Sequence, residues 1–208
     1  MKSPYAGYDV LSKWNTPSFN ERTRQVLKER LDGVPARSFL SEAEWATLDA
    51  IVARLVPQPD RSTPIPITPW IDDDLAHDRG EGFRAPGMPR SREQWRRGLA
   101  GIDAEALGRA GRPFRALDPE MQDATLHAIQ DGDVDPAHWQ GIDARHFFTH
   151  VLLKRVAGLY YTHPDEYGET LESTMRIKAY DEPIAASWPE SLETWKRYYA
   201  EHPRPVNA

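Results

Sequence analysis

Hydrophobic residues recur at intervals of three or four along most of the chain, which is the period of one face of an α-helix. The clearest helix start is at Ser41, which forms a capping box with Glu44, and Pro57 stops the helix that follows. The apolar stripe of this segment consists of Trp45, Leu48, Val52 and Leu55. The pattern therefore predicts a helix over residues 41–56.

Two further segments begin with the same kind of start signal. Ser18 with Glu21 predicts a helix that ends at Gly33, a residue favoured just after a helix. Ser91 with Gln94 predicts a longer helix. Its apolar face consists of Trp95, Leu99, Ile102, Ala106 and Leu107.

A helix cap followed by proline occurs twice. Thr68 before Pro69 predicts a short helix that continues to about residue 77, and the helix dipole accounts for the acidic run 72–74 near its start. Asp118 before Pro119 predicts another helix. The stripe of this second helix consists of Met121, Leu126 and Ile129.

The last segments complete the prediction of the fold. Residues 143–162 carry apolar side chains on most faces, which indicates a centrally buried helix, and residues 190–201 predict a final amphipathic helix. No stretch alternates with the period of a strand. We therefore predict an all-α fold of about six to seven helices joined by Pro-rich loops. Its parts are an N-terminal arm with a short helix (1–38), a helical core (39–168) and a C-terminal arm with a short helix (169–208).

Composition and charge exclude several functions. The chain of 208 residues has 32 acidic and 26 basic residues, a net charge of -6, so it lacks the positive surplus that nucleic-acid binding requires. Without cysteine it has no disulfides, thiolate metal sites or thiol nucleophiles. No apolar run approaches the roughly 20 residues of a membrane-spanning helix. The first residues contain no apolar segment of an export signal.

The best candidates for metal binding are His146 and His150, because two imidazoles one helical turn apart can share an ion. No carboxylate base lies between them, so we favour a structural or interface role for the pair. The chain has no phosphate-cradling loop and no dinucleotide fingerprint. We therefore expect no catalytic residue, cofactor or metal in this chain.

Several large or charged side chains are candidates for a partner interface. Four tryptophans lie near loops or predicted helix ends, where an aromatic residue is either part of the core or a partner anchor, and the sequence leaves these two alternatives open. Arginines at the start of the helix after residue 90 form a basic patch, which is either a solvated face, the interpretation that the sequence favours, or a contact with an acidic partner surface. The candidate interface residues are Trp14, Trp70, Trp139, Trp188, Arg92 and Arg96.

The order of the segments resembles a known family. The matching stretches are 39–51 (FLSEAEWATLDAI), 54–57 (RLVP), 95–106 (WRRGLAGIDAEA), 117–123 (LDPEMQD) and 147–168. These segments resemble the gluconate 2-dehydrogenase subunit 3 family, in sequence order and in spacing. The resemblance covers roughly residues 39–168.

The resemblance implies an accessory role. Members of this family are small, cofactor-free helical subunits of a large FAD-dependent dehydrogenase of the glucose-methanol-choline class, often with a cytochrome c subunit as electron acceptor. The FAD and the catalysis would then belong to the partner of a heterodimer, and the substrate would be a sugar, sugar acid or polyol. Two alternatives remain open, a stand-alone metal-dependent enzyme that uses His146 and His150, and a helical adaptor for an unrelated partner.

The resemblance also bears on localisation. Family members commonly begin with a twin-arginine export signal, which is absent from this sequence. Either the chain is exported to the periplasm together with a signal-bearing partner, or the complex is cytoplasmic. We favour co-export, because a dehydrogenase that feeds a cytochrome must share its compartment.

Overall fold

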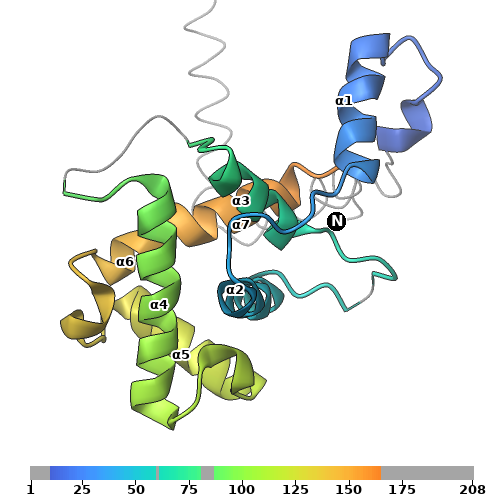
Figure 1. Cartoon of the computed structure of the whole chain (residues 1–208). Helices are drawn as coiled ribbons and strands as arrows, with labels where there is room; N and C mark the ends of the chain where they lie inside the picture. The colour runs from blue at the N-terminus through green and yellow to red at the C-terminus, as the bar shows by residue number, and fades with distance from the viewer. Residues whose placement is uncertain (1–9, 60, 81–86, 165–208) are drawn as a thin grey trace, which may run out of the picture.

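A computed structural model describes residues 10–59, 61–80 and 87–164, and every regular element in them is a helix (Figure 1). The all-α prediction is therefore confirmed, whereas the predicted helix at 190–201 and Trp188 lie outside the described residues. The α-helices are α1 (Glu21–Asp32), α2 (Glu42–Leu55), α3 (Ile67–Ala76), α4 (Ser91–Ala110), α5 (Pro119–Asp131), α6 (Ala144–His146) and α7 (Lys154–Tyr161). The remaining elements are the 3-10 turns η1 (Val10–Lys13), η2 (Phe114–Ala116) and η3 (Pro136–Trp139), and the π-helical segment η4 (Phe147–Leu153).

Two of the predicted helix starts are confirmed in detail. At the start of α2 the Glu44 amide donates to the Ser41 hydroxyl at 3.3 Å, and the Ser41 amide donates to the Glu44 carboxylate at 2.8 Å. The Asp118 carboxylate accepts a hydrogen bond from the amide of Met121 at 2.9 Å, with proline in the first turn of α5. Each cap supplies an acceptor to an amide that has no partner inside the helix.

Two other predicted caps are wrong. Asn20, not Ser18, caps α1 by accepting a hydrogen bond from the Thr23 amide at 2.8 Å. Ser91 is already the first residue of α4, whose cap position is held by Arg90 without a side-chain hydrogen bond. In both places several polar residues adjoin the helix start, and the side chain that reaches the free amides depends on how the chain enters the helix.

The start of α3 also differs from the prediction. This helix begins at Ile67, so Thr68 lies inside it and does not cap it. The Thr68 side chain is buried, and its hydroxyl donates to the Asp49 carboxylate on α2 at 3.0 Å. The Thr68 hydroxyl, which the sequence pattern predicts as a helix cap, therefore makes a tertiary contact between α2 and α3 instead.

The core forms where α2, α4, α5 and the last helix meet, with α4 running across the helix that contains α6 and α7 (Figure 1). Four of the five predicted apolar positions of α4 are buried, and Leu107 is not, because it is 51% exposed near the end of the helix. Met121, in the first turn of α5, is also exposed. The fully buried large side chains are Trp139, Phe114, Phe147, Leu48, Ile51, Ile67, Ile71, Leu99, Ile102, Ile129, Leu152 and Val156.

Two glycines let aromatic rings pack directly on the backbone of α4. A Cβ atom at Gly98 would overlap the ring of Phe147, and one at Gly101 would lie 2.8 Å from the indole of Trp139. The Phe147 ring is also enclosed by Trp95, whose ring centroid lies 5.7 Å away in an edge-on arrangement. The glycines are therefore required by close packing.

The last helix is interrupted by a π-helical segment. α6, η4 and α7 follow one another without a break, and the residues that join them keep right-handed helical backbone angles. Phe147 and Leu152, five residues apart, are both buried, whereas Thr149 and His150 between them are exposed. The predicted central helix with apolar side chains on most faces therefore contributes to the core, but one of its sides lies on the surface.

An ion pair joins α2 to α5. Arg54 donates from Nε and Nη2 to the two carboxylate oxygens of Asp123, at 2.7 and 2.5 Å. The hydrogen bond from Arg54 and its positive charge hold the pKa of Asp123 below its ordinary value, although partial burial opposes this shift. The same pairing raises the pKa of Arg54.

This ion pair predicts a pH dependence of stability. Because the pKa of Asp123 is lower in the folded chain, the contribution of the pair is complete above the unfolded value of about 4 and is lost as the pH falls through the folded value. We expect a double-mutant cycle of Asp123→Asn and Arg54→Gln, measured by urea unfolding, to give a favourable coupling at pH 7 that shrinks below about pH 4. A coupling that is unchanged at pH 3 would contradict the assignment.

Candidate functional site

Trp139 is part of the core. Its side chain is 1% exposed, its ring packs against Gly101, and its indole nitrogen donates to the Glu105 carboxylate at 3.2 Å. Of the two alternatives that the sequence left open for this tryptophan, the structure shows the core one. The assignment of Trp139 to a partner interface is therefore corrected, because a side chain with so little exposed surface has nothing to offer a partner.

The buried carboxylate of Glu105 was missed by the sequence analysis. One of its oxygens accepts hydrogen bonds from the Asp135 amide at 2.9 Å and from the Trp139 indole, and lies 3.0 Å from Nδ1 of His138. Arg109 lies 3.5 Å from the other oxygen. Glu105 thereby holds η3 against α4. Its position three residues after Ile102, on the buried face, is the signal in the sequence that could have identified it.

Two of the other candidate tryptophans keep part of their surface exposed. Trp14 is half-buried and meets Phe19 edge-on with ring centroids 6.3 Å apart. Trp70, on α3, is also half-buried. Of the candidate interface tryptophans in the described residues, these two keep surface that can contact a partner.

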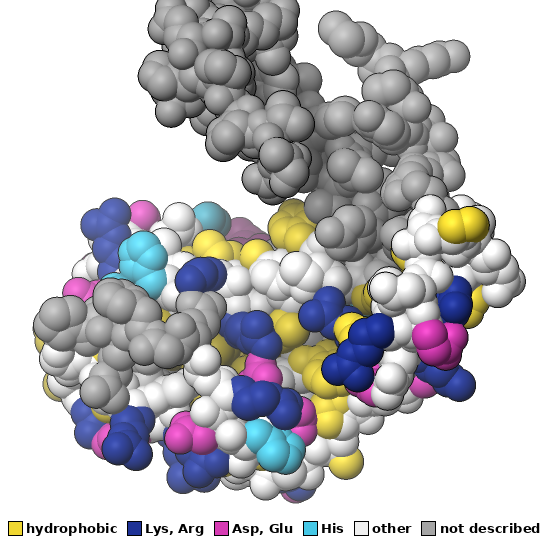
Figure 2. Space-filling model, turned by 90° about the horizontal axis from the view of Figure 1, so that it is seen from above, with side chains coloured by type: hydrophobic (Ala, Val, Ile, Leu, Met, Phe, Trp, Pro, Cys, Tyr) yellow, Lys and Arg dark blue, Asp and Glu magenta, His cyan; other side chains and the backbone are white. Residues whose placement is uncertain are grey.

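Arg92 and Arg96 contact other parts of this chain. Arg92 donates to the carbonyl oxygens of Leu75 and Ala76, both at 2.6 Å, and so satisfies the C-terminal end of α3. The guanidinium of Arg96 lies 4.4 Å from the ring centre of Phe39. Figure 2 shows Lys and Arg side chains beside hydrophobic ones on the upper face of the molecule. The orientations of Arg92 and Arg96 are therefore set by contacts within the chain.

Asp72 has a role that the helix dipole does not explain. Its carboxylate is fully buried and accepts hydrogen bonds from the backbone amides of Ser38 at 2.6 Å, Phe39 at 3.1 Å and Leu40 at 2.6 Å. The interpretation of this residue as a favourable charge near a helix start is therefore wrong. Asp72 instead anchors the loop that leads into α2.

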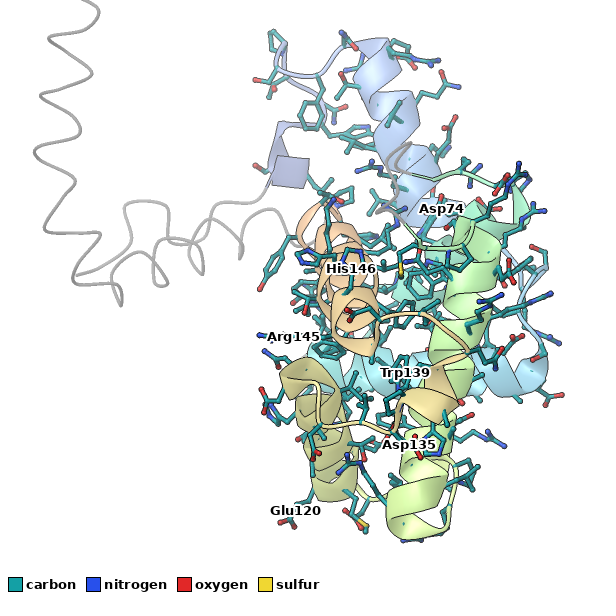
Figure 3. All side chains as sticks on the ribbon, turned by 90° about the vertical axis from the view of Figure 1, so that its left-hand side faces the viewer. Asp74, Glu120, Asp135, Trp139, Arg145 and His146 are labelled. Atoms are coloured by element: carbon teal, nitrogen blue, oxygen red, sulfur yellow. The ribbon has the colours of Figure 1, made fainter. Side chains whose placement is uncertain are left out.

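The next two carboxylates on α3 form ion pairs. Asp73 pairs with Arg79, and Asp74 pairs with both Arg79 and Arg155. The Asp74 and Arg155 pair links α3 to α7, on the side of the molecule shown in Figure 3. These carboxylates therefore already have cationic partners in the fold.

His146 and His150 lie at the edge of an open depression of about 490 Å³ between the end of α5 and the start of the last helix. Figure 3 shows Arg145 and His146 on this side, above the end of α5. The depression is lined by Gln130, Asp131, Asp143, Arg145, His146, Thr149 and His150. Thr149 and His150 of the π-helical segment form one wall of this depression.

The two imidazole rings of this depression face each other closely, with ring centroids 4.9 Å apart and planes inclined at 42°. Asp143 is used locally, because its carboxylate accepts a hydrogen bond from the His146 amide at 2.8 Å and caps α6. Within the described ranges, no group of three or more His, Cys, Asp or Glu side chains is arranged around a common metal position. The depression therefore offers a pair of imidazoles and no larger ligand set.

Comparisons with known proteins identify the family but no individual relative. No curated protein and no solved structure matches this chain. None of the described helices is long and apolar enough to cross a membrane. Residues 42–176, well over half of the 208 residues, match the model of the family described as gluconate 2-dehydrogenase subunit 3. The chain therefore belongs to the gluconate 2-dehydrogenase subunit 3 family.

Proposed function

We propose that this chain is a non-catalytic small subunit that binds and stabilises a large FAD-dependent oxidoreductase of the glucose-methanol-choline class. The match of residues 42–176 to the subunit 3 family supports the proposal, because the family is described as a subunit and a subunit acts with a partner. The substrate of the complex is then a sugar, sugar acid or polyol. The FAD belongs to the large subunit.

The side chains that contact the large subunit are, in this proposal, the half-buried tryptophans. Trp14 and Trp70 each keep accessible aromatic surface, and large aromatic residues contribute strongly to protein interfaces. Arg92 and Arg96 add a basic border whose orientation is set by contacts with α3 and with Phe39.

Electron transfer and localisation follow from the same proposal. A cytochrome c subunit accepts the electrons that the flavin removes from the substrate. The complex then acts in the periplasm, and this chain reaches that compartment by export together with its partner. Fractionation of cells that carry or lack the partner gene tests co-export, because periplasmic recovery of this chain should depend on the partner.

Co-purification with a flavoprotein is the decisive test. We expect the tagged chain, co-expressed with a large FAD-dependent oxidoreductase subunit of the glucose-methanol-choline class from the same organism, to retain that subunit with about one FAD per complex in the absorbance spectrum. Trp70→Ala should lower the recovered flavin, because it removes aromatic surface from the contact. The matched control is Leu107→Ala, which truncates a residue that is 51% exposed at the far end of α4.

The co-purification experiment tests the proposed function and the role of Trp70 separately. If the large subunit and its flavin are absent from the purified material, the proposed function is wrong. Equal flavin recovery with Trp70→Ala and Leu107→Ala would leave the function intact and remove Trp70 from the interface. Circular dichroism of each variant shows whether the fold is retained.

A further inference from the structure

We propose that His146 and His150 chelate one divalent transition-metal ion, of the Zn²⁺, Cu²⁺ or Ni²⁺ class, in the depression beside the π-helical segment. The sequence alone favoured a structural or interface role for this pair. In the structure neither ring makes a hydrogen bond or an ion pair to another described residue, and each ring contacts the other. A structural role would use at least one ring nitrogen, so the fold leaves the chelating atoms of both side chains available.

The spacing of the two rings suits a shared ion. Imidazole nitrogens bind Zn²⁺ at about 2.0–2.1 Å. Two rings bound to one ion at angles between a right angle and the tetrahedral angle therefore have centres about 4.5–5.2 Å apart. The observed separation of 4.9 Å lies inside this range. The present spacing of the two rings is therefore compatible with chelation of one ion by both.

The charges around the depression favour a cation over an anion. Asp131 and Asp143 contribute two negative charges to the lining and Arg145 one positive charge. Asp131 is also the last residue of α5, whose partial negative end is offset by the partial positive charge at the start of the last helix, so the two carboxylates determine the sign of the field. An anionic ligand would meet this field unfavourably, whereas a divalent ion is stabilised by it.

The ligand type selects among the cations. Imidazole suits Zn²⁺, Cu²⁺ and Ni²⁺, whereas Mg²⁺ and Ca²⁺ prefer oxygen ligands. His150 is exposed and His146 half-buried, so water completes the coordination of the bound ion. Only two ligands come from the chain, so the site is an open one, and its remaining positions are accessible to solvent.

Isothermal titration of the full chain with ZnCl₂ at pH 7, after removal of any affinity tag, tests the site. We expect one Zn²⁺ per chain with micromolar affinity, and no heat of binding with MgCl₂ at the same concentration. His146→Ala and His150→Ala should each weaken binding at least about tenfold, since a single imidazole cannot chelate. The matched control is His127→Ala, which removes an exposed histidine of α5 outside the depression.

The melting temperature, measured with and without Zn²⁺, distinguishes loss of metal binding from loss of folding. Zn²⁺ that binds only the folded chain raises the melting temperature. The wild type and His127→Ala should therefore melt at a higher temperature with Zn²⁺. His146→Ala and His150→Ala should melt cooperatively, at a temperature that Zn²⁺ does not change. The proposal is overturned if the wild type binds no Zn²⁺. It is equally overturned if folded His146→Ala or His150→Ala retains wild-type affinity.

Discussion

Gly98→Ala is expected to lower the free energy of unfolding by up to about 2 kcal/mol, although alanine is the better helix former. The new Cβ atom would overlap the ring of Phe147, which is fully buried and enclosed by Trp95. Overpacking of this kind costs about 1–3 kcal/mol and occasionally more, against a gain in helix propensity of about 1 kcal/mol. Chemical denaturation of the purified chain measures the difference.

The matched control is Gly158→Ala, in α7. No atom lies within 4 Å of a Cβ built at Gly158, so this variant should gain about 0.5–1 kcal/mol from helix propensity alone. Adding Phe147→Leu to Gly98→Ala should recover part of the loss, because a smaller side chain makes room for the methyl group. Equal stability of the Gly98→Ala and Gly158→Ala variants would show that α4 and Phe147 are not in close contact.

Asp72→Ala is expected to destabilise the chain by about 3–5 kcal/mol. The substitution removes the acceptor of three backbone amides, those of Ser38, Phe39 and Leu40, from a carboxylate that is fully buried. A buried amide without a partner, here that of Leu40, costs about 1–3 kcal/mol, and the partly buried amides of Ser38 and Phe39 each add a smaller cost. Asp72→Asn should cost less, because one amide oxygen can still accept.

Asp78→Asn provides the comparison for this prediction. Asp78 is 57% exposed and lies 4.0 Å from Arg92, so its removal should change stability by less than about 0.5 kcal/mol. Hydrogen exchange of residues 38–40 should accelerate in Asp72→Ala and remain unchanged in Asp78→Asn. An Asp72→Ala variant as stable as Asp78→Asn would refute the role of Asp72 as an anchor.

The helices were predictable because local signals determine them. Ser41 and Asp118 were assigned correctly as caps, since each lies directly before an apolar stripe and has no competing polar neighbour that reaches the same amides. Thr68 was assigned wrongly, because its hydroxyl is used by Asp49, a residue 19 positions earlier. A sequence pattern gives no information about such a distant partner.

The polar anchors and the π-helical segment were not predictable for the same reason. Asp72 and Glu105 lie on helices where a carboxylate is ordinarily solvated, and only the approach of another segment explains their burial. The segment 147–153 was interpreted as hydrophobic on most faces, because an α-helical period was assumed throughout. With the longer π-helical turn, Phe147 and Leu152 fall on one side.

The π-helical segment also sets the direction in which the last helix faces. Each α-helical residue turns the chain by about 100° and a π-helical residue turns it by less, so α7 is rotated by about a third of a turn relative to an uninterrupted α-helix. Arg155 reaches Asp74, and Val156 reaches the core, in this rotated position. Removing a single residue from η4 would turn α7 away from α3, so the length of this segment is under tighter constraint than the identity of its exposed side chains.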